Sequence, residues 1–196
     1  MKKFDTQEIN QLIAYRRSVY PVQFSGQKIE EAIIEQMLEN ANWAPNHGRT
    51  QPWRFSVFTD NGLATLANFQ SELYKKVATA QDTFDETKFQ KLATQPLQCS
   101  HIISIGMQRQ ASGRIPEIEE IEAVACAVQN MWLTAAAYGV GCYWGSGGIT
   151  YYPEALEFFG LNEGDKLLGF LYLGKPKGEL PAGRATDYRE KVRWVR

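Results

Sequence analysis

One stretch of this chain restricts its fold more than any other, an apolar segment that runs from Ile121 to Tyr138. Val124, Val128 and Trp132 recur in it at helical spacing, and small or apolar side chains occupy most of the other positions. A helix that is apolar nearly all round must be covered on nearly all sides. In a chain of 196 residues, this predicts a helix at the centre of the domain or at a subunit interface.

Length, charge and cysteine content narrow the class of protein. The 196 residues suit a single domain over residues 1–196, with a C-terminal extension from about residue 175. A net charge of −1 argues against a nucleic-acid partner, and no apolar run is long enough to span a membrane. The N-terminus lacks the apolar core of a secretion signal. Three widely spaced cysteines suit small apolar filling positions in a reducing compartment, so we expect a cytoplasmic protein without a metal site.

The remaining elements follow from the spacing of apolar residues. Helical spacing predicts helices over residues 5–16, 27–43, 62–81, 84–92 and 121–138, and a short one over residues 153–159. Alternating or β-branched runs predict strands over residues 54–59, 101–107, 140–144 and 166–173. Near the C-terminus, Val192, Trp194 and Val195 alternate with charged residues, a pattern that favours an edge strand over a solvated tail.

Three segments carry groups suited to binding a ligand. Arg16-Arg17-Ser18 follows the first helix, and two guanidiniums with a hydroxyl can hold a phosphate monoester. A solvated helix end would also attract arginine, because of the helix dipole. The loop over residues 44–53 contains two prolines and His47, which is either a binding residue or a surface histidine. Gly145-Ser146-Gly147-Gly148 lets the backbone approach a flat or bulky group, or is only a turn.

Two further sets of polar residues have a simpler structural interpretation. Glu117, Glu119, Glu120 and Glu122 can in principle provide an acid/base pair, but carboxylates are also favoured in the first turns of a helix. His101 opens an apolar strand, where a structural role is the simpler one. The chain has no Gly-x-Ser-x-Gly segment and no cluster of metal-ligating residues, so we name no catalytic side chain.

Taken together, five segments resemble the FMN-dependent nitroreductase family, and in particular its compact subgroup with an Ala-Pro-x-His loop. The shared order of these segments over nearly the whole chain carries the resemblance, since none of them is specific alone. They are Arg16-Arg17-Ser18; Trp43-Ala44-Pro45-Asn46-His47 leading to Gln51-Pro52-Trp53; Gln129-Asn130 with Leu133, Ala135 and Ala136; Trp144-Gly145-Ser146-Gly147; and Leu173-Gly174-Lys175-Pro176.

This resemblance implies an α+β fold, a nitroreductase-like three-layer sandwich with a mostly antiparallel sheet flanked by helices. It also implies a homodimer, with the long central helix at the dimer interface and FMN bound there by both chains. NAD(P)H is the implied co-substrate. The cofactor-binding positions that match the family pattern are Arg16, Arg17, Ser18, Trp43, Pro45, Asn46, His47, Gln51, Trp144, Gly145, Ser146, Gly147 and Arg184.

Each part of this set has an implied role. The residues from Arg16 to Ser18 hold the phosphate and ribityl end of FMN. Trp43 and His47 reach the flavin from the other chain, and the residues from Trp144 to Ser146 line its ring system.

A late basic residue completes the phosphate site in the family. Arg184 is our candidate for that residue, with Lys177 and Arg193 as alternatives. The Asn/Lys pair that many relatives carry before the strand at residues 101–107 has no counterpart in residues 88–100.

The implied reaction is a ping-pong cycle in which the flavin carries the chemistry. NAD(P)H passes a hydride to flavin N5 and leaves, and a nitroaromatic, a quinone or a similar small molecule then accepts the electrons. Two alternatives stay open. The first is a flavoenzyme of the same fold with another reaction, such as dehalogenation or dehydrogenation. The second is a flavin-binding redox module with slow turnover.

Overall fold

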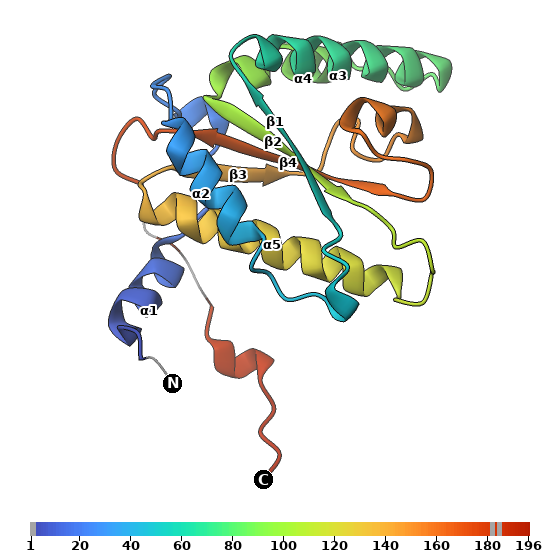
Figure 1. The fold of residues 1–196 in the computed structure, drawn as a ribbon. Coiled ribbons are helices and arrows are strands. Elements are labelled where there is room, and N and C mark those ends of the chain that lie inside the picture. Colours follow the sequence, from blue (N-terminus) through green and yellow to red (C-terminus); the bar gives the residue numbers. More distant parts are fainter. Residues whose placement is uncertain (1–2, 181–182, 184–185) are drawn as a thin grey trace.

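A four-stranded antiparallel sheet forms the middle layer of the protein (Figure 1). The computed structural model describes residues 3–180, 183 and 186–196. The strands pair in the order β1-β2-β4-β3. Their bounds are Trp53–Thr59 for β1, His101–Met107 for β2, Gly141–Gly145 for β3 and Lys166–Gly174 for β4.

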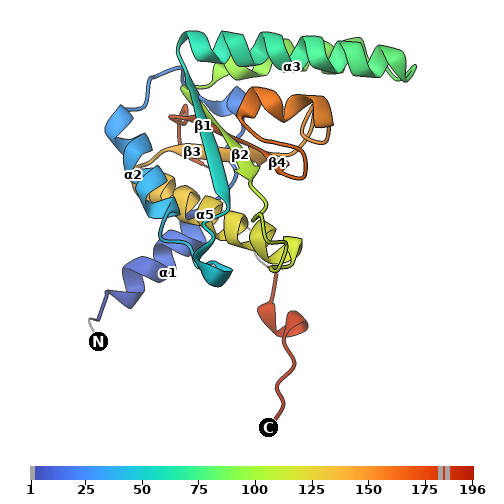
Figure 2. The ribbon, with the colours of Figure 1, turned by 45° about the vertical axis from the view of Figure 1, so that its right-hand side comes forward.

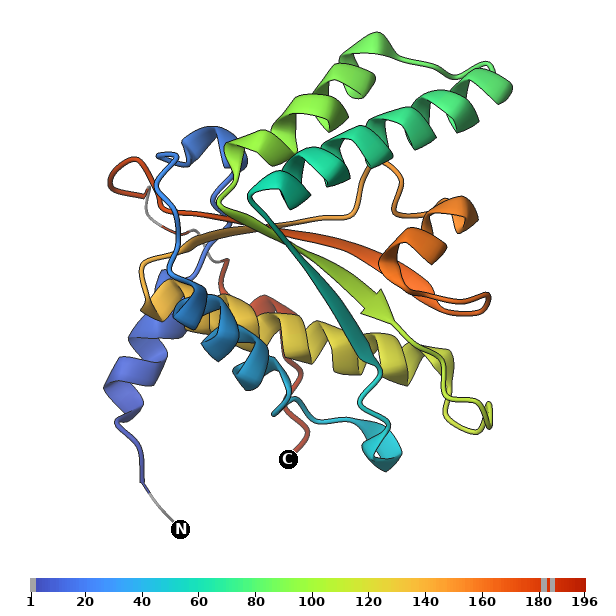
Figure 3. The ribbon, with the colours of Figure 1, turned by 45° about the horizontal axis from the view of Figure 1, so that its top comes forward.

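Helices cover both faces of this sheet, which confirms the predicted three-layer α+β fold (Figures 2 and 3). One face packs against α2 (Glu31–Ala41) and α5 (Glu117–Ala137). The other face packs against α3 (Asn61–Ala80), with α4 (Glu86–Thr94) alongside it. Strand β2 is buried along its whole length because its side chains alternate between the two cores. Ile103 and Ile105 join the core under α2 and α5, and Ile102 joins the other.

A bulge in β4 changes which face its side chains occupy. Gly169 pairs with Ile105 and Leu167 pairs with Gly106, so Leu168 is an extra residue without an opposite partner. Gly169 has a φ of +127°, a value that residues with a side chain rarely adopt. The bulge turns Leu168 toward the core under α5, on the same side as Leu171.

Helix α5 begins at Glu117, so Glu117, Glu119 and Glu120 lie in its first turn and Glu122 in the next, as the dipole argument predicted. Val124 and Val128 are buried against the sheet. On the opposite side of the helix, Ile118 is 58% exposed and Cys126 is also exposed. The residues that the structure describes therefore leave this side of α5 uncovered, because the sheet and α2 cover the other side.

The two ends of the chain lie on the α5 side of the sheet (Figures 1 and 2). Helix α1 (Thr6–Tyr15) buries none of its residues. In the tail, a short 3-10 turn at Tyr188–Lys191 is followed by irregular chain, and Trp194 is 71% exposed. The prediction of an edge strand here is wrong for the described residues, because the tail runs away from the sheet and has no strand to pair with.

Several boundaries also differ from the predictions. The helix predicted over residues 27–43 starts later and ends earlier, since residues 27–30 have no regular secondary structure, Glu30 is the N-cap and Ala41 is the last helical residue. The short helix over residues 153–159 is two 3-10 turns, Pro153–Ala155 and Glu157–Phe159. No helix in the described part of the chain is long and apolar enough to cross a membrane.

Candidate functional site

The Arg16-Arg17 pair lies where α1 ends, against α5. Arg16 forms the C-cap of α1, and its Cζ lies 4.6 Å from the centre of the Trp132 ring. The Nε of Arg17 donates to the carbonyl oxygen of Tyr15 at 2.7 Å, and its Cζ lies 5.0 Å from the Tyr15 ring centre. Both arginines are half-buried. Aromatic faces therefore hold two positive charges side by side, unlike a fully solvated helix end.

After these arginines, the chain runs alongside β3. Ser18 forms a parallel bridge with Cys142, and the Val19 N–H donates to the Cys142 carbonyl oxygen at 2.8 Å. Trp132 adds a second link, because its Nε1 donates to the carbonyl oxygen of Arg17 at 3.3 Å. Burial raises the pKa of the Cys142 thiol, and the charge of Arg16 opposes that rise. The pairing brings Arg16-Arg17-Ser18 beside the strand that leads to Trp144.

A hollow of about 420 Å³ opens where β3 ends, within the size range of small-molecule sites. Its walls are Ile121, Trp132, Trp144, Ser146, Tyr151 and Leu168. The Trp144 side chain is fixed because its Nε1 donates to the Leu168 carbonyl oxygen at 3.1 Å. A Cβ on Gly169 would lie 2.4 Å from the Gly145 carbonyl oxygen, so this contact between β4 and β3 requires glycine. Gly147 follows the hollow in an exposed turn.

Trp132 lies at this site, although the sequence pattern assigned it only to the core. Its ring lines the hollow beside Trp144 and also a smaller, more enclosed space with Arg16 and Arg17. Helical periodicity indicated a buried stripe on α5 and nothing more. The cation–π contact with Arg16 depends on how α1 packs on α5, which periodicity does not report. Leu168 was missed for a similar reason, because the bulge decides its direction.

The tail passes the arginine pair. A Cβ built on Gly183 would lie 3.8 Å from Nη2 of Arg17. Arg184, our candidate for the last phosphate contact, lies outside the described residues. Of the alternatives, Lys177 donates to the Val22 carbonyl oxygen at 3.1 Å, and Arg193 is exposed.

The second group of predicted residues lies on the loop after α2. Trp43 is 80% exposed, and Pro45 is exposed as well. Asn46 closes the loop, because its Oδ1 accepts a hydrogen bond from the Gln51 N–H at 3.1 Å. Gly48, Arg49 and Gln51 have positive φ values of +61°, +56° and +44°. Left-handed conformations at non-glycine residues cost energy and gather at binding sites, which makes this loop a candidate site segment.

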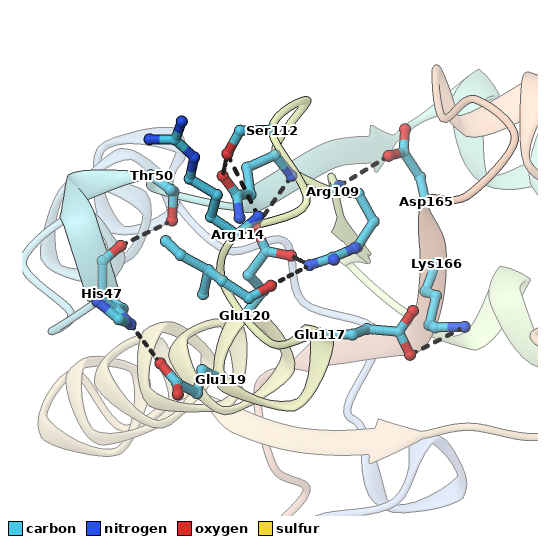
Figure 4. A network of polar contacts seen from close by, with 12 residues as sticks. His47, Thr50, Arg109, Ser112, Arg114, Glu117, Glu119, Glu120, Asp165 and Lys166 are labelled. Carbon is cyan, nitrogen blue, oxygen red and sulfur yellow. Dashed lines mark hydrogen bonds and ion pairs between the residues drawn. The ribbon is translucent and has the colours of Figure 1, made fainter.

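Three polar contacts fix His47 within this loop, from Thr50 and Glu119 (Figure 4). The Thr50 N–H and Oγ1 both donate to the His47 carbonyl oxygen, at 3.3 and 3.2 Å. The His47 Nδ1 lies 2.6 Å from Oε2 of Glu119 in the first turn of α5. A Cβ on Gly48 would lie 3.2 Å from Cδ1 of Ile115, so the loop also packs on the segment before α5.

Within one chain, the predicted residues form two separate groups. Ile121 and Trp132 lie on one side of α5 and line the hollow. Glu119, which holds His47, is two positions before Ile121 and therefore about 160° away around the helix by the shorter way. The uncovered side of α5, with Ile118 and Cys126, lies between the two groups. The loop at His47 therefore does not reach the hollow of its own chain.

The glutamates of α5 tie three segments to the helix (Figure 4). Glu117 pairs with Lys166 of β4 at 3.4 Å, Glu119 pairs with His47, and the buried Glu120 pairs with Arg109 after β2. These pairs favour a structural role for the cluster over acid/base chemistry. The described residues contain no cluster of three or more His, Cys, Asp or Glu side chains that could hold a metal ion.

The fold and the geometry together define a three-layer α+β protein in which Trp132 links a hollow of small-molecule size to a pair of arginines. Residues 13–175 match the Nitroreductase family, so this chain belongs to that family. It is 32% identical over 144 residues to "Putative NAD(P)H nitroreductase YdjA" of Escherichia coli K12, which covers 74% of this chain and 76% of that protein.

Solved structures show the same fold. A nitroreductase-like family protein from Bacillus cereus superposes with a TM-score of 0.81 at 26% identity, covering 100% of this chain and 98% of the other. A nitroreductase from Desulfovibrio desulfuricans, solved in complex with FMN and described as putative, superposes with a TM-score of 0.72 at 20% identity, covering 100% and 99%. These likenesses confirm the nitroreductase-like fold implied by the sequence.

Proposed function

We propose that this protein is an FMN-dependent NAD(P)H oxidoreductase that reduces nitroaromatics, quinones or similar small acceptors. The observation that carries the proposal is that the Trp132 side chain contacts Arg16 and Arg17 and also lines the same hollow as Trp144. The family match, the NAD(P)H nitroreductase description of the E. coli relative and the FMN complex of the D. desulfuricans protein support it.

The residues of this region fit FMN from its phosphate to its ring. Arg16 and Arg17 offer charged forks of donors for the phosphate, and the exposed Ser18 adds a hydroxyl. Trp132 and Trp144 give the hollow aromatic walls for a flat ring system. The exposed residues Ser146 and Gly147 would present backbone N–H groups to the ring edge. When bound, FMN would supply the two-electron transfer between NAD(P)H and the acceptor.

We propose further that the protein acts as a homodimer through the uncovered side of α5. That side separates the hollow from the loop at Trp43 and His47, so a second copy packed on it would bring its own loop over the hollow. Exposed apolar residues such as Ile118 on α5 and Ile13 on α1 support such an interface. The three free thiols of Cys99, Cys126 and Cys142 support a reducing, cytoplasmic location.

Colour is the first test of the proposal. The purified protein, reconstituted with FMN where necessary, should absorb at about 450 nm, as flavins do. Under anaerobic conditions, NADH or NADPH should remove this absorbance. Addition of a quinone or a nitroaromatic should restore the absorbance. A protein that cannot be loaded with FMN would refute the proposal, and a loaded protein that neither nicotinamide bleaches would refute the reaction.

Comparison of FMN with riboflavin tests the phosphate site, because only FMN carries the phosphate. The Arg16→Ala/Arg17→Ala variant should bind FMN about 100-fold more weakly, since two charged hydrogen-bond donors are lost, and should bind riboflavin as before. The matched control is Lys75→Ala/Lys76→Ala, which removes the same charge from exposed positions on α3. Equal FMN affinity in both variants would contradict the assignment of the arginines.

A further inference from the structure

We propose that Glu119 is a positioning residue that orients His47 toward the flavin of the partner copy. The inference rests on the proposed function, because it concerns how the loop at His47 meets the cofactor. The side chains of His47 and Glu119 are 60% and 40% exposed, and a contact this exposed normally contributes little to stability. The reason for this pair must therefore be sought in what it does to the imidazole.

The contact assigns a role to each imidazole nitrogen. Glu119 can only accept a hydrogen bond when ionised, so the Nδ1 that lies 2.6 Å from its Oε2 must carry the proton. In a neutral imidazole, Nε2 is then the acceptor, and the partner of one nitrogen thus decides the chemistry of the other. Nε2 can accept a hydrogen bond from an N–H or O–H group of the ligand, and FMN offers both.

Hydrogen bonds to the backbone around His47 also restrict the position of its side chain. Two donors of Thr50 hold the His47 carbonyl oxygen, and the hydrogen bond from Gln51 to Asn46 closes the loop. The left-handed residues Gly48 and Arg49 follow directly, so the segment is held in a costly conformation. With Nδ1 engaged by Glu119, Nε2 is the imidazole nitrogen that remains for a ligand.

The first measurement concerns the tautomer and needs no flavin. The chain has only two histidines, so the imidazole nitrogen signals of a ¹⁵N-labelled sample separate easily. At a pH where both rings are neutral, His47 should carry its proton on Nδ1 in the wild-type protein. In Glu119→Ala, this preference should be lost. His101, whose Nδ1 lies 2.9 Å from Ser100 Oγ, serves as an internal reference that should not change.

The matched control is Glu117→Ala. Glu117 lies in the same turn of α5 and forms an ion pair of similar exposure with Lys166, so the control removes the same helix-end charge. It should leave the His47 tautomer unchanged. A Glu119→Ala spectrum identical to that of the wild type would overturn the proposal.

The second measurement is the Kd for FMN, from the quenching of flavin fluorescence. Glu119→Ala should weaken FMN binding about 3- to 10-fold, the scale of one lost hydrogen bond, and His47→Ala should weaken it at least as much. The double variant should be no worse than His47→Ala, because both changes remove one interaction. Additive losses, or a loss of the same size in Glu117→Ala, would overturn the positioning role.

The outcomes separate this inference from the proposed function. If wild-type protein does not bind FMN, the proposed function fails, while the tautomer measurement still decides whether Glu119 controls His47. If FMN binds normally to the wild type, His47→Ala and Glu119→Ala alike, the positioning role fails and the proposed function stands.

Discussion

The buried ion pair between Arg109 and Glu120 should be the most sensitive electrostatic link in the protein. The Glu120 side chain is 1% exposed, and its two oxygens accept from Nη1 of Arg109 and from the N–H of Gln110. The same Nη1 donates to the Ile115 carbonyl oxygen at 3.1 Å. Replacing Arg109 with Met leaves a buried carboxylate with one backbone donor, and breaking a buried pair in this way costs about 3–5 kcal/mol. Since the Arg109 side chain is 24% exposed, water can reach the gap and we expect about 3 kcal/mol.

Urea unfolding followed by circular dichroism measures this cost. A loss of about 3 kcal/mol corresponds to a decrease in the urea midpoint of about 1 M at the slope expected for a chain of this size. Protein concentration must be held fixed, because a dimer gains stability with concentration.

A second variant tests the reasoning. Arg109→Met/Glu120→Leu removes both charges and should recover about 2 kcal/mol, leaving a deficit of about 1 kcal/mol for the unpaired Gln110 N–H. If Arg109→Met lies within about 1 kcal/mol of the wild type, or if the double variant is no more stable than the single one, the buried pair does not behave as argued.

Two further predictions concern residues outside the proposed flavin contacts. His101 is buried, and burial foremost, with the nearby charge of Lys28, lowers the pKa of its imidazole below 6.5. The unfolded state therefore binds a proton that the native state does not, so stability should fall as the pH drops below about 6.5 toward the lower native pKa. Unfolding free energies at pH 7.5 and 5 should show a smaller decrease in His101→Gln than in the wild type, and an equal decrease would contradict this assignment. Gly169→Ala should lose more stability than Gly164→Ala, measured by thermal unfolding. Both have positive φ values, of +127° and +90°, but only a Cβ at Gly169 meets other atoms, 2.4 Å from the Gly145 carbonyl oxygen. Backbone strain alone costs of order 1–3 kcal/mol, and equal losses would show that the close approach of β3 and β4 adds nothing.

Local sequence patterns predicted best the elements that are covered in the same way on both faces. Strand β2 has the bounds predicted, because the run from His101 to Met107 is apolar on both faces and both faces are covered. Apolar spacing alone placed the start of α5 at Ile121, four residues late, whereas the glutamates before it indicated the first turn correctly. The strand predicted for the tail is wrong, because alternation of apolar and charged residues reports only the polarity of side chains. It does not report whether a neighbouring strand is available for hydrogen bonding.

By itself, the sequence determined which chemical groups this protein carries and the order in which they occur. The charges of Arg16 and Arg17, the exposed loop at His47 and the apolar length of α5 are properties of adjacent residues, and they sufficed to indicate the family. Only the tertiary structure decided which of these groups meet. Ser18 pairs with Cys142, and His47 pairs with Glu119 at a separation of 72 residues. Such contacts depend on strand pairing, a bulge and helix packing, which arise from the whole chain at once and leave no mark in any one segment.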